Sequence, residues 1–303
     1  MRFSVWPSPQ RPWRDIREIV LHCDESGWDG VYFADHFMPD DPGGRPVDGA
    51  VLECWAVLAG LAAETRRLRL GSLVSGNLYR HPAVVAKAAA TIDHISGGRF
   101  VVGLGAGWQV NEHAAYGIDL LEVGPRLDAL DEACTVIRSL LSEQRTTFEG
   151  RHYRIDDAPC DPLPVQSRLP LLIGGAGERR TMRIAARHAD EWNAWGSAED
   201  FARRTGVLEE HCAAVGRDPS SIVRSTQALV YLSTDEGWLA PRRHETAGRA
   251  RLLGTPAELV DQVAAYAAVG VDELIVPDWM MGSARRSIDT LDLFRDEVAV
   301  HFR

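Results

Sequence analysis

The sequence predicts an α/β fold: a closed (β/α)8 barrel (TIM barrel) over residues 1–303, a single domain with an insertion after the fourth strand. Short apolar runs of β type alternate with amphipathic helices along most of the chain, and eight such runs can be counted. Nearly all their residues are apolar, which is typical of parallel strands covered on both faces. A doubly wound sheet is the rival fold, but it normally has fewer strands and a clear dinucleotide-binding fingerprint. The eight predicted strands span residues 3–6, 30–34, 68–74, 100–104, 171–173, 191–195, 225–232 and 272–276.

Apolar spacing and end signals predict the helices between these strands. Residues 13–26 repeat apolar side chains at i, i+3, i+4 and i+7, and the stripe closes at Gly27. A helix over 52–63 leads to the third strand, and an alanine-rich helix over 82–95 follows it. Towards the C-terminus, Thr255-Pro-Ala-Glu258 is a capping box with proline at the first helical position.

The alternation breaks between residues 109 and 169. One long helix is predicted here from an apolar stripe, and a stretch rich in Pro, Asp and Arg follows it. The interval has too few apolar runs for a core of its own, so it is predicted to be an insertion and not a domain. The stripe consists of Leu127, Leu130, Cys134, Ile137 and Leu141.

Composition and charge exclude several classes of protein. The 45% of hydrophobic and 25% of charged residues are ordinary globular values. A net charge of −10 argues against nucleic acid or an anionic membrane as the main partner. No signal peptide and no run of about 18 apolar residues is evident, so we expect a soluble, cytoplasmic protein. The five cysteines form no CxxC pair, and no His, Cys or carboxylate set has metal spacing, so neither disulfide nor metal is predicted.

Polar and glycine-rich residues follow the predicted strands, at the end where barrels carry their functional groups. Such residues at one mouth predict a single site. They are Asp35 and His36, residues 72–77 with Ser72, Leu73 and Ser75, then Gly105, Ala106, Gly107 and Trp108, Gly174, Gly175, Ala176 and Gly177, Asn193 and Trp195, and Asp278 and Trp279.

His36 is the candidate acid or base, because imidazole exchanges protons near neutral pH and Asp35 could orient it. The structural alternative is a loop histidine that caps a helix or bonds to a carbonyl. His81, His94, His113 and Glu112 are further polar candidates.

Two glycine-rich turns suggest ligand contacts. Gly103 to Gly107 reads GLGAG and not the GxGxxG of a dinucleotide fold, so we interpret it as bare backbone for a flat ring, with a plain tight turn as the alternative. Gly174 to Gly177 precedes a helix start and predicts a phosphate site, to which Arg179, Arg180 and Arg183 could add charge. The alternative is a turn followed by a solvated basic helical turn.

Tryptophans at strand ends suggest an aromatic lining or, alternatively, core packing; they are Trp6, Trp108, Trp192, Trp195 and Trp279.

Linked motifs give the chain a family resemblance. The motifs, in order, are VYFADHF (31–37), YRHPA (79–83), DHISGGR (93–99), GLGAGW (103–108), NEH (111–113), IGG (173–175) and ADEWN (189–193). Together they resemble the luciferase-like monooxygenase superfamily, and within it the branch of oxidoreductases predicted to use the deazaflavin coenzyme F-420.

The resemblance implies a barrel whose mouth holds a flavin or deazaflavin ring with its phosphate tail outward. Asp35 and His36 would face the reactive edge of the ring, and Ser72–Leu73 would carry a non-prolyl cis peptide behind it. Ser75, Gly105 to Trp108 and Asn111 would contact the ring, and Gly174 to Gly177 with Arg179 the phosphate. The sugar-phosphate dehydrogenase branch has a glutamate where this chain has Trp108, and lysines for the phosphate. Because Lys87 is the only lysine here, a sugar phosphate is not the expected substrate.

The leading hypothesis is hydride transfer between coenzyme F-420 and a small organic substrate, with His36 as acid or base. An FMN-dependent monooxygenase, which would need a partner reductase, is the first alternative. A non-catalytic flavin-binding protein is the second. The acidic surface is compatible with a homodimer.

Overall fold

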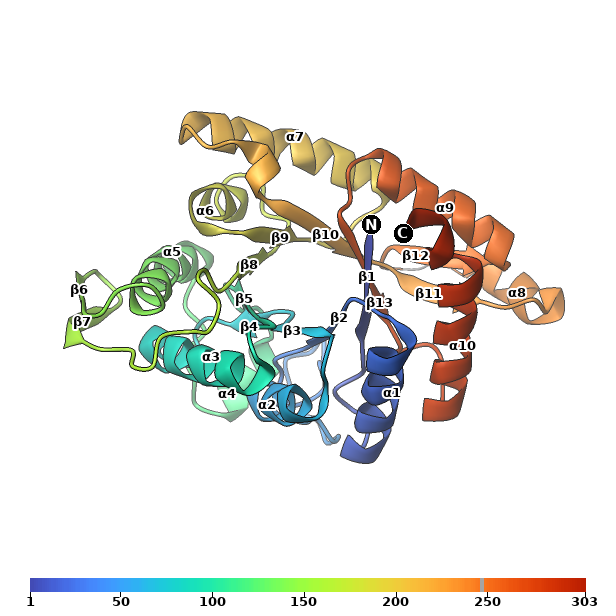
Figure 1. The fold of residues 1–303 in the computed structure, drawn as a ribbon, viewed down its shortest axis with the longest axis horizontal. Helices are drawn as coiled ribbons and strands as arrows, with labels where there is room; N and C mark the ends of the chain where they lie inside the picture. Colours follow the sequence, from blue (N-terminus) through green and yellow to red (C-terminus); the bar gives the residue numbers. More distant parts are fainter. Residues whose placement is uncertain (246–247) are drawn as a thin grey trace.

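The computed structural model describes residues 1–245 and 248–303. Eight parallel strands form a closed barrel, because each pairs with the next and the last pairs with the first (Figure 1). The predicted fold class is confirmed. In order round the barrel, the strands are β1 (Arg2–Trp6), β2 (Gly30–Phe33), β3 (Arg69–Ser72), β5 (Phe100–Gly105), β8 (Leu171–Gly174), β9 (Glu191–Asn193), β10 (Val223–Gln227) and β13 (Glu273–Pro277). The two-residue strand β4 (Ser75–Gly76) continues the line of β3 and pairs with the end of β5.

Helices surround the barrel, and their ends follow the expected local signals (Figure 1). The first helix ends at Gly27, which takes the left-handed φ of 90°. The capping box of Thr255 and Glu258 is present in full. The surrounding helices are α1 (Trp13–Ser26), α2 (Cys54–Glu64), α3 (Pro82–Ser96), α5 (Val123–Leu140), α6 (Thr181–His188), α7 (Ala198–Ala214), α9 (Pro256–Ala268) and α10 (Ala284–Glu297), with 3-10 turns at Pro219–Ser221 and Ala299–Phe302.

The interval 109–169 is only partly an insertion. Its long helix α5 packs between α3 and α6 and takes the place of the fourth barrel helix. The segments that lie outside the βα repeat are α4 (Val110–Ala115) and the antiparallel hairpin β6 (Thr146–Glu149) and β7 (Arg154–Ala158). The predicted apolar stripe is the buried face of α5.

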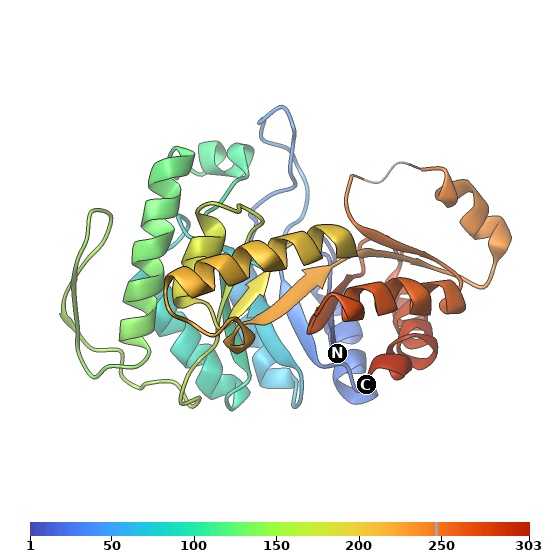
Figure 2. The ribbon, with the colours of Figure 1, turned by 90° about the horizontal axis from the view of Figure 1, so that it is seen from above.

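A second excursion was not predicted. The run 225–232 forms two strands, because the chain leaves the barrel after β10 and forms β11 (Leu229–Leu232). This strand pairs in parallel with β12 (Arg251–Gly254), with α8 (Glu236–Arg243) before it. The hairpin β6–β7 and helix α8 lie at opposite ends of the molecule (Figure 2). Both parts of 225–232 have β-type composition, so composition alone does not mark the point of exit.

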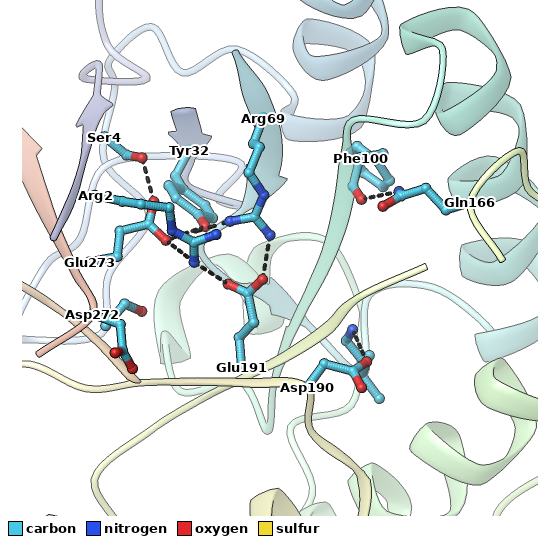
Figure 3. Close-up of polar contacts among 12 residues, drawn as sticks. Arg2, Ser4, Tyr32, Arg69, Phe100, Gln166, Asp190, Glu191, Asp272 and Glu273 are labelled. Carbon is cyan, nitrogen blue, oxygen red and sulfur yellow. Dashed lines mark hydrogen bonds and ion pairs between the residues drawn. The ribbon is translucent and has the colours of Figure 1, made fainter. Parts of the chain in front are cut away.

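The N-terminal end of the barrel interior holds a buried ionic network (Figure 3). Arg2 lies 2.9 Å from Glu273, and Arg69 bonds to Glu191 and lies 3.6 Å from Glu273. Tyr32 donates to Glu273 at 3.4 Å. Burial raises the pKa of Glu191 even though Arg69 opposes the shift. Nothing in the sequence pattern marked these residues as barrel interior. A layer of apolar side chains follows towards the other end, made of Trp6, Tyr32, Ala34, Leu73, Val101, Leu172 and Ile275.

Candidate functional site

A cavity of about 740 Å³ opens at the C-terminal ends of the barrel strands. Residues at or just beyond the end of each of the eight barrel strands line it, as expected for a barrel of this kind. The volume is that of a site for a drug-sized molecule or cofactor. A second cavity of about 790 Å³ lies at the opposite end, beside both chain termini, away from the strand ends that carry the predicted residues.

His36 lies in the cavity wall and is held from behind by a carboxylate. Its Nδ1 is 2.8 Å from Oε1 of Glu112, whose side chain is completely buried. Glu112 also accepts hydrogen bonds from the hydroxyl of Tyr79 and, at 2.6 Å, from the amide of Phe37. Because Nδ1 is committed to Glu112, Nε2 is the ring nitrogen left for a ligand. The ring also meets Trp108 edge to face at 5.7 Å.

The charge on Glu112 is stabilised. Burial acts to raise the pKa of Glu112, but the His36 imidazole, the Phe37 amide and the Tyr79 hydroxyl outweigh burial and leave that pKa below its ordinary value. An ionised carboxylate at this position favours a fixed ring orientation and stabilises the protonated imidazole. Glu112 is therefore the residue that orients His36.

The expectation that Asp35 orients His36 is wrong. Asp35 pairs with Arg80 through two hydrogen bonds, at 2.7 and 3.1 Å, and Arg80 also binds Glu53. Burial raises the pKa of Asp35, although the Arg80 guanidinium opposes the shift. Asp35 still lines the cavity. Neighbours in an extended segment point in opposite directions, so adjacency in sequence did not identify the partner of His36.

The wall formed by β3, β5 and β8 has glycines at positions where a side chain would collide with Val74 or with the backbone of Ser72. A Cβ on Gly105 or Gly174 would lie 2.7 Å from a methyl group of Val74. A Cβ on Gly103 would lie 1.9 Å from the carbonyl oxygen of Ser72. The close approach of Ser72 and Val74 is thus the main reason for these glycines. The exposed backbone that a flat ring could contact is a secondary consequence.

The non-prolyl cis peptide is Leu73–Val74, one residue beyond the expected Ser72–Leu73. The amide of Leu73 still donates to the carbonyl of Phe33 at 2.8 Å, so the strand ladder includes Leu73 and the chain departs after it. Ser72 is completely buried and exchanges hydrogen bonds with the backbone of Gly103. It does not line the cavity, contrary to expectation.

Other expected residues also lie outside the lining, namely Asn111, Gly177, Arg179 and Asp278. The Asn111 carboxamide donates to the carbonyls of Pro39 and Arg45, at 2.9 and 3.3 Å. It therefore tethers the loop that follows β2, because its face of α4 points at that loop and not at the cavity. The expected residues that do line the cavity include Asp35, His36, Leu73, Ser75, Gly105, Ala106, Gly107, Trp108, Gly174, Gly175, Ala176 and Asn193.

The loop before α6 retains the features of an anion site. Within the described residues, no hydrogen bond uses the amides of Ala176 and Gly177. Arg180 is paired with Asp128, whereas exposed Arg179 has no carboxylate partner in the described part of the chain. Free amides beside a helix start can bind a phosphate group.

Four of the five expected tryptophans line the cavity: Trp6, Trp108, Trp195 and Trp279. Trp192 instead lies in the core, where it stacks on Phe201. Sequence reasoning missed Gln227 and Arg249, which also line the cavity. Gln227 ends β10 within a run that was taken as one long strand, and Arg249 belongs to the unpredicted excursion.

Asp278 precedes Trp279 of the cavity lining, and its buried carboxyl group should make the free energy of unfolding depend on pH. Its side chain is fully buried, accepts from the amide of Ser8 at 2.8 Å and is 2.7 Å from the Arg11 guanidinium. Burial raises the pKa of Asp278 from 3.8 to about 6, although Arg11 opposes the shift. The folded chain therefore binds this proton more tightly than the unfolded chain. The stabilisation is complete below about pH 4 and is lost as the pH rises through about 6, with an upper limit of about 3 kcal/mol.

Urea unfolding of wild type and Asp278→Asn at pH 4, 5, 6 and 7 measures this effect, since asparagine does not titrate. The free energy of unfolding of the variant relative to wild type should rise with pH across this window. A difference that stays constant with pH would contradict the assignment.

A family model described as "Luciferase-like monooxygenase" matches residues 1–238. The chain belongs to the luciferase-like monooxygenase family. The expected family membership is thus confirmed. Among the described residues, no helix has both the length and the apolar character needed to cross a bilayer.

Curated relatives of this family member include a protein named as an F420-dependent dehydrogenase and one named as a monooxygenase. An F420-dependent glucose-6-phosphate dehydrogenase of Kineococcus radiotolerans is 34% identical over 225 residues, 73% of this chain and 64% of that protein. The pyrimidine monooxygenase RutA of Stutzerimonas stutzeri is 34% identical over 203 residues, 65% of this chain and 55% of that protein. The chain therefore spans less than two thirds of the length of these relatives.

Solved structures share the fold over the whole chain. An F420-dependent secondary alcohol dehydrogenase in complex with an F420–acetone adduct superposes with a TM-score of 0.84 at 18% identity, covering 98% of both chains. The monooxygenase RslO1 from Streptomyces bottropensis superposes with a TM-score of 0.82 at 21% identity, covering 100% of both chains. At these identities the likeness concerns the fold.

Proposed function

We propose that the chain is an oxidoreductase that transfers a hydride between coenzyme F-420 and a small organic substrate. The observation that carries the proposal is the His36–Glu112 pair, 2.8 Å apart, at the edge of the cavity. Hydride transfer at a carbon–oxygen or carbon–carbon double bond also moves a proton at the neighbouring atom. An imidazole held by a buried carboxylate, with Nε2 available, is suited to that transfer.

The residues of the cavity fit a deazaflavin. Gly105, Ala106 and Gly174 line the cavity with backbone against which a flat ring can pack, beside the Val74 side chain that contacts Gly105 and Gly174. The amides of Ala176 and Gly177, with the positive charge of Arg179, would hold phosphate. When bound, the deazaflavin supplies the carbon that accepts or donates the hydride.

The chain's own residues then position and exchange the proton. His36 takes the proton from a substrate hydroxyl when the substrate is oxidised, and returns it when the substrate is reduced. Glu112 keeps Nε2 of His36 turned to the substrate and stabilises its positive charge. Trp108 meets the His36 ring edge to face and is a further contact that fixes the ring's orientation.

Relatives named F420-dependent glucose-6-phosphate dehydrogenase keep a sugar phosphate among the candidate substrates. We nevertheless propose a less polar substrate, because Trp108 stands at the position of that branch's glutamate and the cavity lining in the described residues contains no lysine. An FMN-dependent monooxygenase on the same scaffold is the second candidate, supported by the relative named RutA.

Parallel titrations of the purified protein with coenzyme F-420 and with FMN test the proposal. We expect F-420 to bind at micromolar concentration or below, and FMN to bind at least about ten-fold more weakly, a difference of about 1.4 kcal/mol. Ala176→Glu places a negative charge at the proposed phosphate site and should weaken F-420 binding by about ten-fold. Ala213→Glu, at an exposed alanine of α7, is the matched control and should bind like wild type.

Tighter binding of FMN, with oxygen uptake on its reduction, would replace the proposal with the monooxygenase. Tight binding of F-420 without turnover of any substrate would favour a non-catalytic carrier. If neither cofactor binds, the cavity does not hold a flavin of either kind.

A further inference from the structure

The cavity has two walls of different chemistry. Strands β3, β5 and β8 are neighbours in the barrel, and their ends present backbone and small side chains such as Gly105 and Gly174. Strands β9, β10, β13 and β1 are neighbours on the other side. His36 follows β2, which lies between β1 and β3, so it stands where the two walls meet. The second wall includes Trp6, Trp195, Gln227 and Trp279.

Three indoles of the second wall form an aromatic concave surface. Trp6 and Trp279 have ring centroids 4.7 Å apart, Trp6 and Trp195 5.9 Å, and Trp195 and Trp279 6.1 Å. Their planes are inclined by 40° to 60° to one another. Inclined rings leave faces and edges available to a third aromatic system, in the offset or edge-to-face geometry that such systems prefer.

A single guanidinium stands over this aromatic surface. The Arg249 guanidinium carbon is 5.0 Å from the ring centroid of Trp195 and 5.5 Å from that of Trp279. Within the described part of the chain, Arg249 is the only arginine or lysine that lines the cavity, and no carboxylate pairs with it. Its charge is therefore available to one anionic group of a ligand.

The same wall contains polar atoms without protein partners. Among residues 1–245 and 248–303, Nε1 of Trp6, Nε1 of Trp279 and Oε1 of Gln227 are buried and make no hydrogen bond. Because these polar atoms are buried, the wall presents mainly indole surface to a ligand. Such a wall suits a ligand with few polar groups.

From this wall we infer the substrate class: a planar aromatic or conjugated molecule with one carboxylate. Its ring packs against Trp6, Trp195 and Trp279, its carboxylate binds Arg249, and its reducible double bond faces His36. The inference rests on the proposed function. A hexose phosphate fits less well, because it carries a dianion and several hydroxyls, whereas the wall has one guanidinium beside three indoles.

The reduction balances with F-420 as its reductant. With reduced F-420 as the hydride donor, one atom of the double bond would accept a hydride, and His36 would give a proton to the other. The substrate would thus gain two electrons and two hydrogens, the deazaflavin would be oxidised, and His36 would recover its proton from solvent.

Calorimetric titration with cinnamate, with its neutral analogue cinnamamide and with glucose 6-phosphate tests the substrate class without requiring turnover. Cinnamate should bind wild type about ten-fold more tightly than cinnamamide, and Arg249→Gln should abolish that preference. Trp279→Leu should weaken both aromatic probes about three- to ten-fold. Arg242→Gln is the matched control, because Arg242 covers Trp238 at 3.8 Å, away from the cavity, and it should bind all probes like wild type.

Each variant is also titrated with F-420, so that the two proposals are separated. Normal F-420 binding without binding of cinnamate overturns the substrate class and leaves the proposed function standing. Failure of F-420 to bind overturns the proposed function, whatever the probes do. Equal binding of cinnamate and cinnamamide to wild type removes the role of Arg249, and tighter binding of glucose 6-phosphate than of cinnamate replaces the aromatic class by a sugar phosphate.

Discussion

His36→Asn is expected to lower kcat by about 10²- to 10⁴-fold while changing the Kd for coenzyme F-420 by less than about two-fold. Asparagine can still donate from its carboxamide to Glu112, so the contact that fills the space behind His36 is retained. What is lost is Nε2, the nitrogen proposed to exchange a proton with the substrate. Stopped-flow measurement of cofactor oxidation, together with the binding titration, gives both numbers.

His81→Asn is the matched control. His81 caps α3 by accepting a hydrogen bond from the amide of Ala83, and asparagine is an equally good N-cap residue. This variant should retain wild-type kcat. If His36→Asn also retained it, His36 would have no part in proton transfer, and the proposed mechanism would be wrong.

Glu112→Gln separates positioning from catalysis in the same experiment. Glutamine preserves the shape behind His36 and can still accept from the Phe37 amide, but it lacks the charge of the carboxylate that orients the ring. The kcat should therefore fall by about ten-fold or more while KM changes less, because the loss concerns the proton transfer and not substrate binding. A purely structural role would lower the amount of folded enzyme and leave kcat per folded molecule unchanged.

Gly103→Ala is expected to lower the free energy of unfolding by about 3 kcal/mol. The added Cβ would lie 1.9 Å from the carbonyl oxygen of Ser72, which is backbone of the adjacent strand and cannot rotate away. One of the two strands must move, which disturbs the ladder between β3 and β5 beneath the cavity. Urea unfolding followed by circular dichroism measures the change.

Gly206→Ala is the contrasting substitution. Gly206 lies in α7, is exposed, and a Cβ there would meet nothing within 4 Å. Because alanine is the better helix former, this variant should be more stable than wild type by about 0.5–1 kcal/mol. Equal unfolding midpoints for the two variants would show that the close approach at Gly103 relaxes without cost.

The sequence alone determined the barrel and the mouth at which the candidate site lies. Helix stripes and caps are local signals, and α1 spans residues 13–26 as its apolar spacing predicts. The apolar runs in the sequence located every barrel strand, because a strand buried on both faces must be apolar almost throughout. The rule that functional groups follow such strands then located most of the cavity lining, from Asp35 to Trp279.

Only the tertiary structure decided which residues meet. Glu112 is 76 positions from His36 in the chain, yet it reaches His36 from α4, while the adjacent Asp35 turns to Arg80. The space in front of Gly103 is filled by the neighbouring strand β3, and Arg249 reaches the cavity from an excursion that no local pattern predicted. Periodicity reports which face of its own element a side chain occupies; the partner across that face is set by how the elements pack, so long-range pairs such as His36 and Glu112 become evident only in the folded chain.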